Sequence, residues 1–362
     1  MTIAVLKEIF PETRVSLIPE HIIILKKWHV NVVVESGAGM NAFASDEKYI
    51  EAGAIVTSRE EAILQADIIL SINMVADEDL NKINNKLLLG LYQFLFNKEK
   101  ITGLAAKNIT VFSMDMLPRT TRGQSMDVLS SQANIAGYKA VLKAANTYSR
   151  YFPMFMTAAG SIPPAKVMIL GAGVAGLQAI ATARRLGAVI EVFDTRPAVK
   201  EEVMSLGAKF IEVEGAADAS KAGGYAVVQT EEFMQKQKAK IAESVAKADI
   251  IITTAQIPGR KAPLLITEEM FANIKIGSVI IDLAAATGGN TAFTKNNETI
   301  LKNGVTIIGN SFLPSDMPGD ASKLYGKNIL NFLQLIITKE GNLNLNFDDD
   351  LVKGTCVAKP NV

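Results

Sequence analysis

Three glycines and one aspartate stand out in the sequence, because their spacing suits the binding of a phosphorylated ligand against the backbone. Gly171, Gly173 and Gly176 have the spacing G-x-G-x-x-G and follow residues 167–170, an apolar run with the length of a buried strand. Gly171 permits a tight turn, Gly173 lets a pyrophosphate approach the backbone, and Gly176 lets the following helix lie close to the sheet. The first free N–H groups of that helix would then face the phosphates.

The elements around the glycines complete a β-α-β unit. A helix is expected from Val174 to Leu186, with Gly187 as its end, and a second strand from Val189 to Phe193. Asp194 follows that strand directly, where an acid can accept hydrogen bonds from both hydroxyls of an adenosine ribose. Its charge would repel the 2′-phosphate of NADP. The sequence therefore predicts a dinucleotide site that prefers NAD(H).

The composition limits the classes of protein that fit. The chain has 362 residues, enough for two domains, and it is 49% hydrophobic and 20% charged, as globular proteins are. Its 37 basic residues balance 37 acidic residues, so overall charge does not favour a nucleic-acid partner. The start MTIAVLKEIFP lacks the pattern of a signal peptide, and no segment is expected to span a membrane.

Few residues could ligate a metal. Cys356 is the only cysteine, which excludes an intramolecular disulfide and a cysteine-rich metal site, and it fits a reducing compartment. His21 and His29 are the only histidines. We interpret both as polar residues on a surface helix rather than as a metal pair, and we predict no metal site.

Alternating strand and helix patterns predict a parallel sheet covered on both faces in the first third of the chain. The expected strands are 2–6, 31–35, 67–72, 86–92 and 109–114, and the expected helices begin at Pro19 or span 47–52, 60–65 and 98–107. A polar loop at 117–125 precedes a long helix at 126–146, whose length suits a strut between two domains.

A second α/β unit is expected at about 165–310, after an irregular connector at 151–164. Segment 215–225 is rich in Gly, Ala and Ser, and we expect it to be mobile. The remaining expected elements are helices at 231–247 and 320–337 and strands at 249–254, 278–283 and 305–309. We predict a first domain of residues 1–125 plus 325–362 and a nucleotide-binding domain of residues 126–324.

Six segments together resemble the alanine dehydrogenase and transhydrogenase group over nearly the full chain. They are PETRVSLIPE (11–20), PRTTRGQSMDVLSSQANIAGYKAV (118–141), ILGAGVAGLQAIATARRLGAVIEVFDTRP (169–197), TTAQIPGRKAP (253–263), DLAAATGGN (282–290) and KNILNFL (327–333). GQSMDVLSSQ and GTCV (354–357) resemble the NAD(H)-binding domain I of proton-translocating transhydrogenases. The resemblance implies two doubly wound, Rossmann-like domains with an NAD cleft between them.

The two branches of this group differ in their chemistry. Alanine dehydrogenases use a lysine, a histidine and an aspartate to bind a 2-oxo acid and move its protons. The corresponding positions here are Asn73, Phe96 and Ala286, while Arg14 resembles the carboxylate-binding arginine. Without its partners we interpret Arg14 as structural. The resemblance therefore favours direct hydride transfer between two nicotinamides, which needs binding and orientation but no acid or base.

The resemblance also implies which residues act. Arg119, Gln124, Asp127 and Ser130 would position the nicotinamide and its ribose, with Ser125 and Met126 beside them. A linker with helix caps is the alternative interpretation of this loop. The remaining residues implied to surround NAD(H) are Gly171, Gly173, Val174, Gly176, Asp194, Thr195, Arg196, Gly224, Gln237, Gln256 and Tyr225, the last in a loop that closes over the nucleotide. Gln256 and Ala286 depart from the leucine and glutamate usual in the family.

The resemblance finally implies an assembly. The chain would form a homodimer and work with a subunit that binds NADP(H) and a membrane-spanning subunit that translocates protons. It would lie in the cytoplasm, held at the inner membrane by these partners, and it would not turn over alone. An alanine-dehydrogenase-like enzyme is the alternative function, and an NAD(H)-sensing binding protein is a third.

Overall fold

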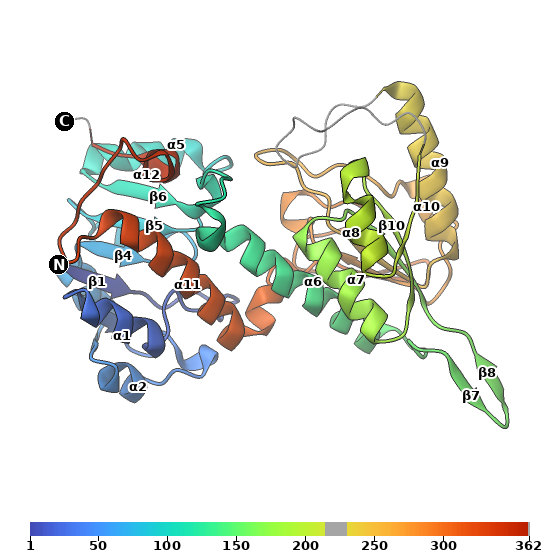
Figure 1. Ribbon diagram of the computed structural model, residues 1–362, viewed down its shortest axis with the longest axis horizontal. Coiled ribbons are helices and arrows are strands. Elements are labelled where there is room, and N and C mark those ends of the chain that lie inside the picture. The colour runs from blue at the N-terminus through green and yellow to red at the C-terminus, as the bar shows by residue number, and fades with distance from the viewer. Residues whose placement is uncertain (214–229, 361–362) are drawn as a thin grey trace. The chain divides into compact units, whose positions relative to one another are not determined.

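The computed structural model describes residues 1–213 and 230–360. The chain divides into two compact units, Met1–Gln132 with Pro314–Val362, and Ala133–Leu313 (Figure 1). The first division falls within helix α6 (Val128–Thr147) and the second just before helix α11 (Pro318–Ile336), where the sequence suggested 125/126 and 324/325. The segment expected to be mobile, 215–225, lies outside the described residues.

The first unit is built on a seven-stranded sheet. Its strands are β1 (Thr2–Val5), β2 (Asn31–Glu35), β3 (Ile55–Thr57), β4 (Ile68–Leu70), β5 (Leu87–Gly90), β6 (Thr110–Ser113) and β16 (Cys356–Ala358). Their order is β16-β6-β5-β4-β1-β2-β3, and all neighbours are parallel except β16 and β6. The predicted parallel sheet is confirmed. Strand order reverses between β1 and β4, the position at which such sheets bind ligands.

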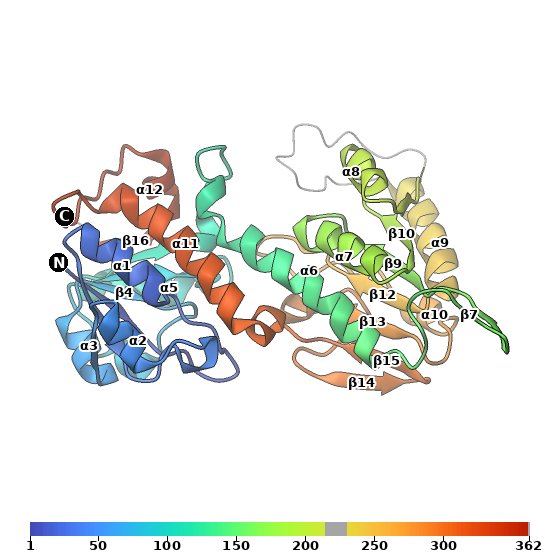
Figure 2. The ribbon, with the colours of Figure 1, turned by 60° about the horizontal axis from the view of Figure 1, so that its bottom comes forward.

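Helices cover both faces of this sheet, because successive side chains of a strand point to opposite sides. Ile3 and Val5 join the core that packs on α1 (Pro19–Lys27), α2 (Asp46–Glu51) and α11. Ala4 and Leu6 join the core that packs on α3 (Arg59–Gln65), α4 (Asp77–Leu80) and α5 (Lys98–Gly103). Figure 2 shows α1 beside α11, and α12 (Asp350–Thr355) completes the unit.

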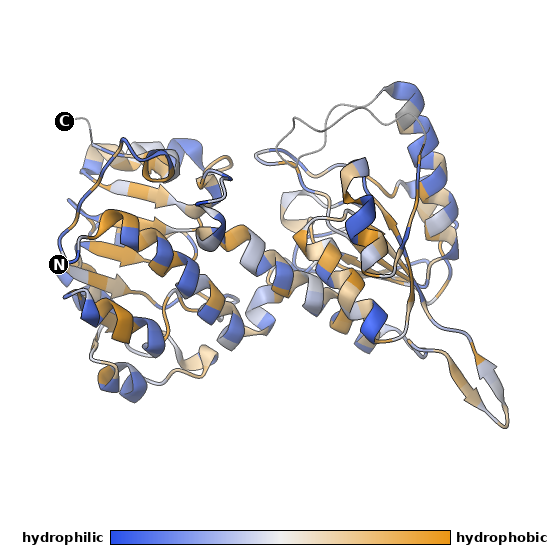
Figure 3. Ribbon diagram, in the orientation of Figure 1, coloured by the Kyte–Doolittle hydropathy of each residue, from blue (hydrophilic) through white to orange (hydrophobic). Residues whose placement is uncertain are grey.

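The second unit repeats this design. Its strands are β9 (Lys166–Leu170), β10 (Val189–Phe193), β11 (Lys209–Phe210), β12 (Ile250–Thr253), β13 (Val279–Asp282), β14 (Thr299–Lys302) and β15 (Val305–Ile308). Their order is β11-β10-β9-β12-β13-β15-β14, parallel except for β14, and strand order reverses between β9 and β12. The strands of both sheets are mostly apolar, as expected for parallel sheets buried on both faces (Figure 3).

Four helices and the second-unit part of α6 cover the second sheet. Side chains of α6, α7 (Val174–Arg185) and α8 (Lys200–Ser205) pack on one face, and those of α9 (Glu231–Lys247) and α10 (Glu268–Phe271) pack on the other. The predicted β-α-β unit is confirmed in β9, α7 and β10. Gly187 follows α7 with φ of +86°, so the predicted helix end is also confirmed.

The expected irregular connector contains a β-hairpin, so that interpretation was wrong. Strands β7 (Phe155–Thr157) and β8 (Gly160–Ile162) pair antiparallel, and all six residues are exposed. The hairpin has no buried face, so its sequence carries no alternation of apolar and polar residues. The Tyr151 ring stacks on Phe155 with centroids 4.8 Å apart.

His21 is buried on α1, and its interpretation as a surface residue was therefore wrong. Its Nδ1 accepts a hydrogen bond from the Ile18 N–H at 3.2 Å, and its ring packs against Gly326 of α11, where a Cβ would lie 2.3 Å from the ring. Burial lowers the pKa of His21 to about 4. The residue is therefore a neutral part of the helix packing, whereas His29 is exposed after the end of α1.

Across residues 1–213 and 230–360, no helix is long and apolar enough to cross a membrane. In the same residues, no group of three or more His, Cys, Asp or Glu side chains could hold a metal ion.

Candidate functional site

The glycine turn connects β9 to α7 in the second unit. Gly171 has φ of +106°, and a Cβ placed on it would lie 2.3 Å from Thr254 Oγ1. A Cβ on Gly176 would lie 2.0 Å from the Gly171 carbonyl oxygen. Neither position can accept a side chain. The tight turn and the close helix packing expected from the glycine spacing are both present.

Gly173, the N-cap of α7, differs from the other two glycines. A Cβ placed on it would have no heavy atom within 4 Å, so the packing of the chain does not itself require glycine here. No side chain caps the helix, whose first N–H groups therefore remain for an anion at its positive dipole end. The first helical residue, Val174, is 41% exposed. Open space beside uncapped N–H groups fits the pyrophosphate of a dinucleotide.

Asp194 follows β10 and lies beside the glycine turn. Its Oδ2 accepts a hydrogen bond from the Ala172 N–H at 2.7 Å, which ties the acid to the turn. Arg196 forms an ion pair with Asp194, with Nη2 2.8 Å from Oδ2. The expected adenosine-binding acid is thus correctly placed beside the turn, and it is already paired with a cation from the next loop.

Two loops follow β12 and β13 at the same edge of the second sheet. Thr254 Oγ1 donates to the Gly171 carbonyl at 3.1 Å, which joins the loop after β12 to the glycine turn. Gln256 Nε2 donates to the Leu283 carbonyl at 2.9 Å. The departure from the family leucine at Gln256 therefore adds a hydrogen bond between the two loops.

Asp282 and Asn290 hold these loops in place, and we did not predict either residue. Both are fully buried. Asn290 bonds the backbone of Ala255, and its Nδ2 also donates to the Pro263 carbonyl at 2.8 Å. Asp282 Oδ2 accepts from the Asn290 N–H at 2.6 Å and from Thr294 Oγ1 at 2.6 Å. The sequence signal was an acid and an amide after the apolar run of β13, where polar residues reach the ligand-binding edge of a sheet.

The other residues predicted around the nucleotide divide into two groups. Thr195 lies half-buried beside Asp194, and Gln237 is half-buried on α9. Gly224 and Tyr225 lie outside the described residues.

The predicted nicotinamide loop belongs to the first unit. Arg119 and Gln124 are exposed, and Gln124 begins a short 3-10 helix, Gln124–Met126. Asp127 precedes α6, and its Oδ1 accepts from the Ser130 N–H at 2.9 Å while its Oδ2 accepts from Ser130 Oγ at 2.6 Å. Asp127 and Ser130 therefore form a helix cap at one end of a loop that exposes Arg119 and Gln124.

Other elements of the first unit hold this loop from behind. The Ser125 carbonyl accepts from Asn328 Nδ2 and from Asn331 Nδ2, each at 2.8 Å, and both donors lie on α11. Arg122 forms ion pairs with Asp349 and Asp350 at the start of α12. Met126 is buried in the core of the unit. The loop is therefore a fixed platform with polar side chains on its exposed side.

At the β1–β4 reversal of the first unit, buried polar groups pair with one another. Arg14 donates from Nε and Nη2 to the Glu12 carboxylate at 2.8 and 2.6 Å, and from Nη1 to Gln132 Oε1 at 2.7 Å. Asn73 Nδ2 donates to Glu8 at 3.0 Å. Burial raises the pKa of Glu8 to about 7, although backbone N–H groups of residues 72 and 73 stabilise its charged form.

The residues at the positions of the dehydrogenase acid–base groups cannot transfer protons. Asn73 is an amide bonded to Glu8, and both Phe96 and Ala286 are exposed and apolar. Arg14, the one retained group, donates to Glu12 and Gln132 inside the unit. These positions together offer no site for proton transfer to a 2-oxo acid.

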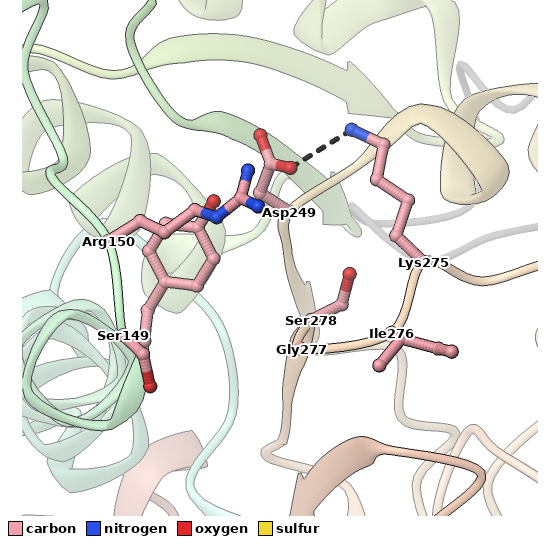
Figure 4. A pocket seen from close by; sticks show the side chains of 8 residues that line it. Ser149, Arg150, Asp249, Lys275, Ile276, Gly277 and Ser278 are labelled. Atoms are coloured by element: carbon pink, nitrogen blue, oxygen red, sulfur yellow. Dashed lines mark hydrogen bonds and ion pairs between the residues drawn. The ribbon is translucent and has the colours of Figure 1, made fainter. Parts of the chain in front are cut away.

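A cavity of 350 Å³ lies at the opposite edge of the second sheet, where β12 and β13 begin (Figure 4). Asp249 there accepts hydrogen bonds from Lys275 Nζ and from the Lys166 N–H, both at 2.9 Å. The glycine turn lies at the carboxyl end of β9, which is parallel to β12. The cavity is therefore separate from the candidate nucleotide site.

Comparisons with known proteins cover nearly the whole chain. Residues 4–136 match the family model "Alanine dehydrogenase/PNT, N-terminal domain", and residues 140–361 match the corresponding C-terminal domain. An NAD(P) transhydrogenase alpha subunit of Rhodospirillum rubrum, the first of the pieces into which that subunit is divided, is 45% identical. The match covers 99% of this chain and 96% of the R. rubrum protein.

Two solved structures extend these comparisons. A transhydrogenase from Sinorhizobium meliloti is 43% identical, with a TM-score of 0.90 over 99% of each chain. An L-alanine dehydrogenase shares the fold at 24% identity, with a TM-score of 0.76 over 92% of this chain and 89% of its own.

Proposed function

The chain belongs to the alanine dehydrogenase/PNT family, a family of NAD-binding oxidoreductases, and from this premise we propose that it is the NAD(H)-binding subunit of a proton-translocating transhydrogenase. In this function a hydride passes directly between NAD(H) on this chain and NADP(H) on a partner subunit. A membrane-spanning subunit couples the transfer to proton translocation. The similarity to the R. rubrum alpha subunit over 99% of the chain supports this choice within the family.

Residues of the second unit would hold NAD(H). The turn from Gly171 to Gly176 and the uncapped start of α7 fit the pyrophosphate, and Asp194 fits the adenosine ribose. Bound NAD(H) supplies the hydride donor or acceptor at its nicotinamide ring. In the first unit, Arg119, Gln124, Asp127 and Ser130 would orient that ring and its ribose. None of these residues gains or loses a proton in the transfer.

One observation carries the choice between transhydrogenase and amino-acid dehydrogenase. Every group that an alanine dehydrogenase would use for its substrate is either replaced or used elsewhere. Asn73, Phe96 and Ala286 cannot act as acids or bases, and Arg14 is committed to Glu12 and Gln132. Hydride transfer between two nicotinamides needs none of these groups, because it depends on positioning alone.

We further propose that the chain is a homodimer that works on the cytoplasmic side of the inner membrane through its partner subunits. The description of the R. rubrum relative as one piece of an alpha subunit supports the existence of partners. The exposed apolar side chains of the β7–β8 hairpin support self-association, because such patches usually mark interfaces. The most exposed of them is Met156, at 74%.

A turnover assay with and without a partner tests the proposal. The purified chain alone should show no activity with NAD and alanine, or with NADH, pyruvate and ammonia. Addition of an NADP(H)-binding transhydrogenase subunit should start hydride exchange between the two nucleotides. A robust rate with alanine would favour the dehydrogenase function, and NADH binding without any transfer to the partner would favour a sensing protein.

A further inference from the structure

The carboxylate of Asp194 is surrounded by four N–H donors. Its Oδ1 accepts from the Arg196 backbone N–H at 2.8 Å and from Arg196 Nε at 2.9 Å. Its Oδ2 accepts from the Ala172 N–H at 2.7 Å and from Arg196 Nη2 at 2.8 Å. A carboxylate has about four lone-pair positions. All of them are therefore used before a nucleotide arrives.

A ribose that donates two hydroxyl protons to Asp194 must displace two of these donors. The Ala172 N–H is part of the glycine turn, and the Arg196 N–H is part of the backbone that follows the strand. The guanidinium is a side-chain group, and the Arg196 side chain is 21% exposed, whereas that of Asp194 is 6% exposed. Nε and Nη2 bond one carboxylate oxygen each, as the two ribose hydroxyls would. The guanidinium thus occupies the place of the ribose diol.

We propose that Arg196 competes with the adenosine ribose for Asp194 and thereby determines how strongly the site discriminates between NAD(H) and NADP(H). This inference rests on the proposed function of the second unit as the NAD(H) site. NAD(H) binds when the guanidinium leaves the carboxylate. The displaced cation stays within reach of the ribose, because its own backbone N–H remains bonded to Asp194 Oδ1.

Charge decides the effect on selectivity. An unpaired Asp194 would repel a 2′-phosphate strongly, since both groups are negative. Arg196 cancels that charge while paired and offers a bidentate partner for the phosphate once displaced. Glu202 of α8 is a further negative group that acts on Arg196. Arg196 therefore weakens NADH binding through competition and improves NADPH binding through attraction, and both effects reduce the preference for NADH.

Two substitutions at this position separate the effects. Arg196→Met removes the donors and the charge with little change in length, and Arg196→Lys keeps the charge but loses the bidentate geometry. Fluorescence titrations of the full chain with NADH and with NADPH give both affinities. Arg196→Met should tighten NADH and weaken NADPH, raising the ratio of their Kd values about tenfold or more, the size of one charge-assisted interaction. Arg196→Lys should tighten NADH with a smaller loss for NADPH.

Arg184→Met is the matched control. Arg184 is an exposed arginine of the same unit that donates to the Gly207 carbonyl at 2.8 Å, so its removal changes the net charge equally. Thermal unfolding of each variant checks that the fold is kept. Weaker NADH binding by folded Arg196→Met, or an unchanged Kd ratio, would overturn the competition. Failure of the unmodified chain to bind either nucleotide would instead overturn the proposed function.

Discussion

Asn290 holds Ala255 by two hydrogen bonds across 35 residues of sequence: its Oδ1 accepts from the Ala255 N–H at 3.1 Å, and its Nδ2 donates to the Ala255 carbonyl at 2.9 Å. Ala255 directly precedes Gln256, a predicted nucleotide contact. The pair therefore sets the backbone of the loop after β12 at the ligand-binding edge of the second sheet.

Replacement of Asn290 by alanine should destabilise the protein. The change leaves the N–H and carbonyl of Ala255 and the carbonyl of Pro263 without this partner, and each buried unsatisfied group costs about 1–3 kcal/mol. We expect a loss of at least about 2 kcal/mol in urea unfolding, with weaker NADH binding. Asn273→Ala, at an exposed amide after α10, is the control and should change stability little. Equal stability of the two variants would refute the role of Asn290.

Glu8 should make stability depend on pH. Its pKa is about 7 in the folded chain against an ordinary value of 4.5, so the folded state binds more protons than the unfolded state between these pH values. Stability from this group should therefore fall as pH rises from about 4.5 to about 7, by up to about 3 kcal/mol.

Glu8→Gln isolates this effect. His21 acts in the opposite direction, because its folded pKa of about 4 lies below 6.5, but it is present in both proteins and cancels in their difference. The unfolding free energy of the unmodified protein minus that of Glu8→Gln should decrease between pH 4.5 and 7. The same difference measured for Glu99→Gln, an exposed glutamate, should stay constant. A constant difference for Glu8→Gln as well would show that Glu8 titrates normally.

The nicotinamide loop should affect transfer more than binding. Gln124 is exposed on a loop fixed by α11 and α12, whereas the adenosine end of NADH is assigned to Asp194 in the other unit. Gln124→Asn shortens the side chain, and small misplacements at a reacting centre can lower the rate about a hundredfold. We expect nearly unchanged NADH affinity and a strongly reduced single-turnover rate with the partner. Equal losses in affinity and rate would make the loop an ordinary binding element.

The exposed hairpin should contribute to the dimer. Sedimentation of the unmodified chain should give about twice its mass of 38.9 kDa. Met156→Asp places a charge at a position that is 74% exposed and should shift the chain to monomer. Leu301→Asp on β14, at 73% exposure, is the control and should stay dimeric. A monomeric unmodified chain at micromolar concentration would contradict the proposed homodimer.

Much of the fold could be predicted because parallel strands buried on both faces are continuous apolar runs. β2 and β10 have the predicted bounds, as does the helix α9. The hairpin β7–β8 could not be found this way, since neither of its strands has a buried side. The burial of His21 depends on its contact with Gly326, which lies on a helix some 300 residues later and only the folded chain shows.

The candidate site shows the same division. The glycine spacing predicted the turn, and the acid after the second strand was correctly placed. The occupation of Asp194 by Arg196 depends on how one side chain folds back on its own loop. The clamp of Asn290 on Ala255 depends on two loops meeting at a sheet edge. Neither follows from the spacing of residues in the sequence.

The most direct test of the central claim follows the hydride itself. NADH carrying deuterium at the transferable C4 position is bound to this chain and mixed with a partner subunit carrying NADP⁺. We predict that the deuterium appears on the nicotinamide of the NADPH formed, without loss to solvent, and that no transfer occurs when this chain is omitted. Deuterium lost to water, or no labelled NADPH with both chains present, would contradict direct transfer between nucleotides.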